Sequence, residues 1–269
     1  MNNSIIEIDA ISYTYPDEET PVFTDLSIEL PSGITTLMGQ NGTGKSTLML
    51  LAGARILPDY GTVTIFGKDS SELINSPERD KYVSFVYQNM EFETEEPIGD
   101  LLHYVHENGF FDKFQDDLLS KLIDVFELKN FLHKRTQEIS KGELQRTIIA
   151  FSLLYGSKSV MMDEPVFAME DYQKERTMGF LMDYARSLNI SIFYSAHELE
   201  LSRKYSDNLL LFRKTGTPVI GKTEELFQKE TIEEAYQVPW DMLYKKERLF
   251  RDTLLRTNPH DNPENANMN

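Results

Sequence analysis

The hydrophobic and polar positions along the chain follow two different periods. Apolar residues alternate with polar ones over residues 5–11 and 22–30, and this period of two is typical of half-buried strands. The turn-rich residues 15–21 separate the two segments, so we expect them to form an antiparallel β region. Further short apolar runs predict strands at residues 34–38, 62–66 and 82–87.

Helical spacing replaces this alternation in the middle of the chain. From about residue 98 to 155, apolar residues recur at intervals of three and four, which predicts an inserted helical part. Beyond it, buried-strand candidates at residues 160–162 and 190–194 flank a helical segment at 171–188. A strand, a helix and a strand in this order predict two parallel strands joined by a crossover helix.

Composition and charge limit the classes of partner. The chain has 269 residues, and 40% of them are apolar, which suffices for one large domain or two small ones. The formal net charge is −17, which disfavours nucleic acid and anionic lipid, because both select basic surfaces. The absence of cysteine excludes disulfides and thiolate metal sites. No signal-peptide pattern or run of 18 apolar residues occurs, so we expect membrane contact only through a partner protein.

A glycine-rich loop follows the strand predicted at residues 34–38. Residues 39–47 contain the pattern G-x-x-x-x-G-K-[ST], in which backbone N–H groups and a helix N-terminus bind phosphate. We expect Lys45 to bridge the β- and γ-phosphates of a nucleotide and Ser46 to offer its hydroxyl to Mg²⁺. The alternative is a glycine-rich turn that matches by chance. The predicted nucleotide-binding residues of this loop are Gly39, Asn41, Gly42, Thr43, Gly44, Lys45, Ser46 and Thr47.

Two adjacent carboxylates follow the buried run at residues 160–162. Asp163 is placed to hold Mg²⁺ through water, and Glu164 is placed to activate an attacking water molecule. Because neighbouring side chains diverge, the two carboxylates can take different tasks. On its own, the same segment is equally typical of an acidic turn after a core strand, which Pro165 ends.

The segment ISKGELQR, residues 139–146, lies just before the apolar run at residues 147–154. Locally it predicts a capping box, in which Ser140 caps a helix and Glu143 reaches back to the backbone of Ser140. Such a box opens many helices and requires no function.

Taken together and in this order, these motifs resemble those of the ABC ATPase family, over about residues 4–225. The resemblance implies that adenine stacks on Tyr15 and that His197 is the switch histidine beside the γ-phosphate. It implies that Gln88 senses the γ-phosphate, contacts the metal and couples to a transmembrane partner. It also makes residues 139–146 the signature motif, which acts on ATP held by the other subunit of a head-to-tail dimer. The signature residues implied to act in trans are Ser140, Lys141, Gly142 and Glu143.

Two of the motifs differ from the common family forms. The signature departs from LSGGQ at Ile139, Lys141 and Glu143, and we expect its function to survive. Residues 167–170, which read FAME, replace S-A-L-D in the D-loop. The longer Glu170 affects communication between the two ATP sites, so a heterodimer with unequal sites is an alternative to a homodimer.

The resemblance implies an α/β fold of the P-loop NTPase type, with a mainly parallel core sheet, an N-terminal antiparallel β subdomain and a helical subdomain at about residues 90–155. We expect a nucleotide-binding domain over residues 1–225, a C-terminal helical extension over 226–257 and a disordered tail over 258–269. The implied activity is hydrolysis of Mg·ATP, with dimer closure powering separate permease subunits. The implied location is cytoplasmic, at the inner face of the cell membrane.

Some alternatives stay open. A soluble ABC ATPase with an assembly or mechanical role would share every motif, and a regulatory domain would bind ATP without turnover. Residues 232–239 are similar to the end of metal-chelate and vitamin importer ATPases, whereas Lys141 is typical of some exporter branches, so the direction of transport is open. His103 and His106 lie one helical turn apart without a third metal ligand, so we expect them on a solvated helix face.

Overall fold

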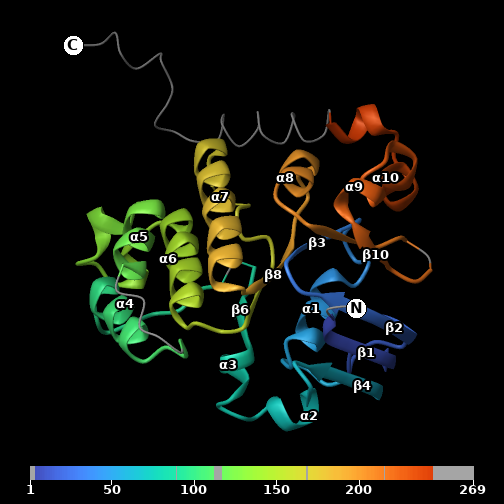
Figure 1. Ribbon diagram of the computed structural model, residues 1–269, viewed down its shortest axis with the longest axis horizontal. Coiled ribbons are helices and arrows are strands. Elements are labelled where there is room, and N and C mark those ends of the chain that lie inside the picture. The colour runs from blue at the N-terminus through green and yellow to red at the C-terminus, as the bar shows by residue number, and fades with distance from the viewer. Residues whose placement is uncertain (1–3, 89, 112–116, 168, 215, 245–269) are drawn as a thin grey trace.

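A computed structural model of the protein describes residues 4–88, 90–111, 117–167, 169–214 and 216–244. Two sheets with covering helices make up this part of the chain (Figure 1). Three parts of the predictions lie outside the described residues: the tail at 258–269, the extension from residue 245 onward, and Ala168 of the D-loop.

The smaller sheet is antiparallel and has the strand order β2-β1-β4-β5. β1 (Ser4–Tyr13) pairs with both β2 (Phe23–Pro31) and β4 (Tyr60–Ile65), and the short β5 (Lys68–Asp69) forms the edge. The pairing of β1 with β2 confirms the antiparallel region that the alternating spacing predicts. The strand predicted at residues 62–66 also joins this sheet rather than the core sheet.

The larger sheet has six strands in the order β10-β9-β3-β8-β7-β6. All neighbours are parallel except β10, which runs antiparallel to β9. The parallel pairing of β7 with β8 confirms the crossover predicted from the sequence. The strands are β3 (Ile34–Met38), β6 (Val83–Val86), β7 (Ser159–Met162), β8 (Ser191–Ser195), β9 (Asn208–Leu211) and β10 (Val219–Lys222).

Side chains of the core sheet enter different hydrophobic clusters on its two faces. In β7, Val160 and Met162 pack with the helical part, whereas Met161 packs with the smaller sheet. In β9, Leu209 and Leu211 belong to a third cluster with the C-terminal segment. Strands buried on both faces read as continuous apolar runs, which is why these segments show no alternation in the sequence.

The helices cover both faces of the core sheet (Figure 1). α1 (Lys45–Ala52) lies between the two sheets, and the helical part at the left of the figure contains α4 (Ile98–Glu107), α5 (Leu118–Val125) and α6 (Lys141–Leu154). α7 (Asp171–Leu188) is the predicted crossover helix. The remaining elements are α2 (Ser70–Leu73), α3 (Arg79–Tyr82), the 3-10 turns η1 (Leu128–Phe131) and η2 (Thr136–Glu138), α8 (Leu199–Lys204), α9 (Thr223–Leu226) and α10 (Lys229–Tyr236).

The two histidines of α4 do not share a solvated face. His103 is exposed, but His106 is only 6% exposed and lies four residues after the buried Leu102, on the inward face of the helix. The predicted solvated face is therefore wrong for His106. Among the described residues, no three His, Cys, Asp or Glu side chains are grouped as a metal site. Within the same residues, no helix combines the length and the apolar character needed to cross a membrane.

Candidate functional site

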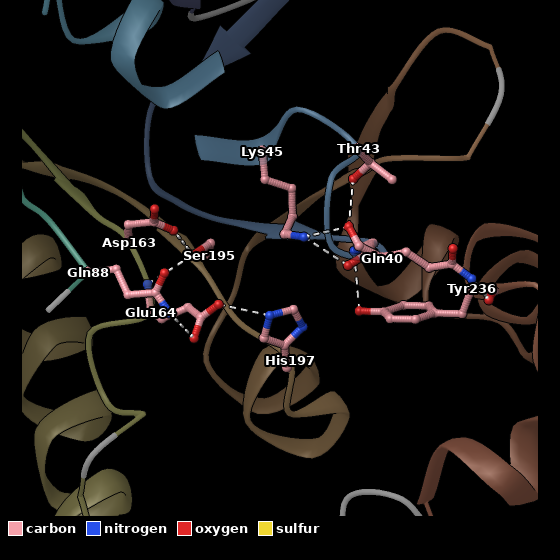
Figure 2. A network of polar contacts seen from close by, with 10 residues as sticks. Gln40, Thr43, Lys45, Gln88, Asp163, Glu164, Ser195, His197 and Tyr236 are labelled. Atoms are coloured by element: carbon pink, nitrogen blue, oxygen red, sulfur yellow. Dashed lines mark hydrogen bonds and ion pairs between the residues drawn. The ribbon is translucent and has the colours of Figure 1, made fainter. Parts of the chain in front are cut away.

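The candidate site lies where four strands of the core sheet end. β3 leads into the glycine-rich loop, β7 into Asp163 and Glu164, β8 into the segment that carries His197, and β6 into Gln88. The carboxyl ends of parallel strands meet at one edge of a sheet, and ligands bind there in open α/β folds. Residues from four distant parts of the chain therefore converge (Figure 2).

The glycine-rich loop needs its glycines for its shape. Gly39, Gly42 and Gly44 have φ angles of 144°, 75° and 95°, in the region that side chains disfavour. A Cβ atom on Gly39 would lie 2.5 Å from the carbonyl oxygen of Phe212. The backbone can approach the end of β9 this closely only with glycine. α1 begins directly after Gly44, so its N-terminus points into the loop as anion binding requires.

Lys45 is folded back onto this loop. Its side chain is buried, and Nζ donates hydrogen bonds to the backbone oxygens of Gly39 (2.9 Å) and Gln40 (2.8 Å). Burial lowers the pKa of this ammonium, while the nearby carboxylates of Glu164 and Asp163 raise it. Phosphate oxygens bind an ammonium more strongly than neutral carbonyls do. Lys45 can therefore exchange its carbonyl partners for the phosphates of a nucleotide.

Asp163 and Glu164 point in different directions, as predicted. Asp163 is 9% exposed and accepts a hydrogen bond from the hydroxyl of Ser195, and that same hydroxyl accepts one from the backbone N–H of Glu164 (2.9 Å). Glu164 has a φ angle of 49°, a left-handed conformation that costs a residue with a side chain roughly 1 kcal/mol. Strain of this kind is typical of functional sites.

Two side chains from other strands hold the carboxylate of Glu164. Its Oε2 accepts a hydrogen bond from Nε2 of Gln88 at 2.9 Å, and its Oε1 lies 2.8 Å from Nε2 of His197. The side chain of Glu164 is 14% exposed, so the carboxylate is half-enclosed but reachable by water. A fixed carboxylate with access to water can act as a general base. Figure 2 shows this group facing Lys45 across the site.

Tyr15 lies beside the loop, next to a polar hollow. Its hydroxyl is 3.1 Å from Oγ1 of Thr47, and its ring meets Tyr13 edge to face with 5.1 Å between centroids. The hollow has a volume of about 480 Å³, within the range that accommodates small ligands. Its lining includes Tyr15, Val22, Gly42, Thr43, Arg213 and Lys214.

The predicted capping box at residues 139–146 is confirmed. The backbone N–H of Glu143 donates to Oγ of Ser140 (3.3 Å), and the backbone N–H of Ser140 donates to Oε2 of Glu143 (2.8 Å). Lys141 is exposed and forms an ion pair with Glu91 (2.9 Å). Among the described residues, no hydrogen bond or ion pair joins Ser140, Lys141, Gly142 or Glu143 to the phosphate loop. Ser140 and Lys141 are both exposed at the start of α6.

Comparison with known proteins identifies the architecture. The model of the ABC transporter family matches residues 23–167. A protein of Archaeoglobus fulgidus that is named as an ABC transporter ATP-binding protein is 30% identical over 240 residues, which cover 86% of this chain and 98% of that protein. The chain belongs to the ABC transporter family. As an ATP-binding subunit of this family, it binds and hydrolyses ATP.

One further relative is similar in sequence, and one solved structure is similar in fold. The petrobactin import ATP-binding protein FatE of Bacillus anthracis is 27% identical, covering 87% of this chain and 94% of that protein. In fold, the chain is similar to the dimeric ATP-binding cassette MJ0796 bound to ADP and Pi. The TM-score is 0.68 with 16% identity, and the match covers 81% of this chain and 98% of the cassette.

Some residues of this ABC subunit's site have only a weak signal in the sequence. Ser195 links Asp163 to the backbone of Glu164, yet it reads as an ordinary residue of a buried strand. Lys174 in α7 is buried and forms an ion pair with Glu198, the residue after the predicted switch histidine. Only a small polar residue at a strand end and a cation within an apolar helix face hint at them. Phe167, which the sequence assigns to the predicted D-loop, is 40% exposed.

Replacing Ser140 with alanine tests the capping box of the ABC subunit. The variant loses the cap, which costs about 1 kcal/mol of unfolding free energy. Burial raises the pKa of Glu143, but the backbone and hydroxyl hydrogen bonds from Ser140 outweigh this and lower it. A carboxylate whose pKa is lower in the folded protein than in the unfolded protein stabilises the fold at pH values above its unfolded pKa. This stabilisation is lost as the pH falls through its folded pKa. Alanine keeps the backbone N–H but lacks the hydroxyl, so part of this stabilisation is lost in the variant. Thermal unfolding should therefore show the largest difference in melting temperature between wild type and variant above the ordinary glutamate pKa of about 4.3, and the difference should shrink as the pH falls below it.

Proposed function

We propose that this subunit binds ATP together with Mg²⁺ at the edge of the core sheet. Lys45 bridges the β- and γ-phosphates, and the backbone of the phosphate loop surrounds the β-phosphate. Tyr15 stacks on the adenine, beside the polar hollow. The observation that carries the proposal is the position of Lys45, whose Nζ sits on the carbonyls of the loop and faces Glu164 (Figure 2).

The donor set fits Mg²⁺. Ser46, Gln88 and Asp163 offer a hydroxyl, an amide oxygen and a carboxylate, which are the hard oxygen ligands that this ion prefers. The described residues contain no cluster of three carboxylate, histidine or cysteine ligands. The fit therefore requires phosphate oxygens to complete the coordination, as is usual for Mg²⁺ in nucleotide sites. When bound, the ion neutralises charge that develops on the transferred phosphoryl group.

Glu164 acts as the general base. Its carboxylate accepts a proton from the water that attacks the γ-phosphate, while the hydrogen bonds of Gln88 and His197 keep it oriented. His197 also positions the γ-phosphate.

The active assembly is a head-to-tail dimer, with a second copy of this chain as the simplest composition. Each copy presents the N-terminus of α6 to the ATP held by the other, so Ser140, Lys141, Gly142 and Glu143 act in trans. Three features of this helix end favour an anion: the exposed Ser140, the helix dipole and a lysine. Phe167 and Glu170 of the D-loop differ from the common family form, so a heterodimer with a related subunit is the alternative.

Dimer closure drives a separate transmembrane permease, to which this subunit binds. An apolar groove of about 410 Å³ lies between β6, α4 and α6, just beyond Gln88. Its lining includes Phe85, Tyr87, Phe92, Leu101, Phe151 and Tyr155. Glu91, Glu93, Glu95 and Glu96 are exposed, and the first three alternate in sequence with the lining residues Met90, Phe92 and Thr94. Cytoplasmic loops of membrane proteins are rich in lysine and arginine, so this acidic segment complements them.

The name of one relative bears on the direction of transport. FatE, which the chain matches over most of both lengths, is named as an import protein. We propose uptake of a small solute, with this subunit at the inner face of the cell membrane. The rival function is that of a soluble ABC ATPase with an assembly or mechanical role.

Purification from native membranes tests the permease and offers a matched pair of variants. The tagged chain, extracted gently with detergent, is expected to carry a stoichiometric polytopic membrane protein that mass spectrometry identifies. Tyr155→Glu places a charge in the apolar groove and should abolish this association while leaving ATP binding intact. Tyr60→Glu, at a site 76% exposed on the smaller sheet, should not. Recovery of soluble companions alone would support the rival function instead.

A further inference from the structure

The C-terminal segment touches the phosphate loop directly. α10 ends at Tyr236, whose hydroxyl accepts a hydrogen bond from the backbone N–H of Gly39 at 3.2 Å. The backbone oxygen of Tyr236 accepts a second hydrogen bond from the side-chain amide of Gln40. Figure 2 shows Tyr236 on the side of the loop opposite Glu164. We infer that Tyr236 is a positioning residue that holds the phosphate loop in the shape that binds nucleotide.

The contact acts on the atoms that hold Lys45. Nζ of Lys45 binds the carbonyl oxygens of Gly39 and Gln40, and Oγ1 of Thr43 donates to the same oxygen of Gln40 at 2.8 Å. Tyr236 thus fixes, from outside, the two residues whose carbonyls organise the loop from inside. Without the contacts from Tyr236, the orientation of Gly39 and Gln40 would depend on interactions within the loop alone.

The end of α10 is itself firmly anchored. Ile232 and Ala235 have no exposed surface, and Tyr236 is 8% exposed. They pack in one cluster with Met38, the last residue of the strand that enters the loop, and with Leu199 near the switch histidine. The packing around Tyr236 fixes the rotamer of its side chain, so its hydroxyl is a rigid hydrogen-bond partner for the loop.

A second contact extends the same arrangement toward the hollow beside Tyr15. Arg213 lines that hollow and pairs with Glu234 of α10 at 3.5 Å. Gly39 and Tyr236 are 197 residues apart in the sequence, so local pattern gives no sign of their contact. α10 therefore belongs to the nucleotide site, although it is distant in the sequence from every motif.

The role predicts a specific kinetic signature. A preformed loop binds nucleotide without first being ordered, so losing the support weakens binding. Once bound, the phosphates hold the loop themselves, and the chemical step is unaffected. Tyr236→Phe should therefore raise the KM for ATP and the Kd for ADP about three- to tenfold, the effect of one lost hydrogen bond, with kcat unchanged.

Tyr244→Phe is the matched control. Tyr244 contacts the same cluster, and its hydroxyl donates to Glu200 at 2.5 Å, away from the loop. The full-length chain is used throughout, with calorimetric titration of ADP, ATP turnover and thermal unfolding without nucleotide. The inference is supported if Tyr236→Phe alone weakens binding while both variants unfold at similar temperatures. Equal Kd values for Tyr236→Phe and wild type would overturn it, as would equal weakening by Tyr244→Phe.

Gln40→Met provides an independent second variant. It removes the amide that donates to the backbone of Tyr236 and preserves the length of the side chain. Added to Tyr236→Phe, it should weaken ADP binding less than additively, because both changes free the same segment of the loop. Strict additivity would overturn the shared role. The inference concerns nucleotide binding alone, so a missing permease partner would leave it untouched.

Discussion

Replacing Glu164 with glutamine is expected to leave ATP binding intact and to lower ATP turnover by roughly 10²- to 10⁴-fold. The amide has the shape of the carboxylate and can still meet Gln88 and His197, but it cannot accept a proton from water. The measurement pairs the Kd for ATP with the rate of phosphate release. The two measurements distinguish an effect on ATP binding from an effect on the hydrolysis step in the same variant.

Glu107→Gln serves as the matched control for Glu164→Gln. Glu107 lies exposed at the end of α4, on a helix that contributes nothing to the site. It changes the net charge by the same amount, so a loss of turnover confined to Glu164→Gln reports the position of the carboxylate. A Glu164→Gln chain with wild-type turnover would remove this residue from the role of base.

Replacing Lys45 with methionine is expected to weaken ATP binding by roughly 10- to 100-fold, the range for lost hydrogen bonds to charged groups. The thioether fills the space of the lysine stem but offers no charge to the phosphates. Removing a buried ammonium also removes its desolvation cost, which is the main cause of its lowered pKa. The unfolding temperature measured without nucleotide should therefore not fall, although the affinity for nucleotide does.

Lys68→Met distinguishes this effect from a general loss of positive charge. Lys68 is exposed in β5, at the edge of the smaller sheet. Calorimetric titration should give it the ATP affinity of the wild type. If Lys45→Met bound ATP as tightly as Lys68→Met, the nucleotide would not lie where the loop and α1 place it.

Elements with strong local patterns could be predicted from the sequence, whereas the short buried strand β9 could not. The alternation in β1 and β2, the glycine pattern before α1 and the capping box of α6 each follow from contacts within a few residues. β9 has only four residues, and a run this short does not distinguish a strand from a buried helical turn. The fold places it beside β3, where a long-range pairing decides its structure.

The candidate site divides in the same way. The motifs that surround Lys45, Asp163 and Glu164 are local, so their chemistry could be predicted from residue types and spacing. The contact between Gln88 and Glu164 spans 76 residues, and the strained backbone of Glu164 depends on Ser195 of another strand. His106 is predicted to be exposed but is buried, because the helical pattern of the sequence does not distinguish an exposed histidine from a buried one.

A cross-link between two chains tests the composite site most directly. The sequence contains no cysteine, so a chain with Asn41→Cys and Lys141→Cys on a Glu164→Gln background carries only the two introduced thiols. Both positions are exposed, one in the phosphate loop and one at the start of α6. With Mg·ATP and a short thiol cross-linker, we expect a covalent dimer that requires both cysteines and nucleotide. Bound ATP with no more cross-linked dimer than in the single-cysteine chains would contradict a site shared between two copies.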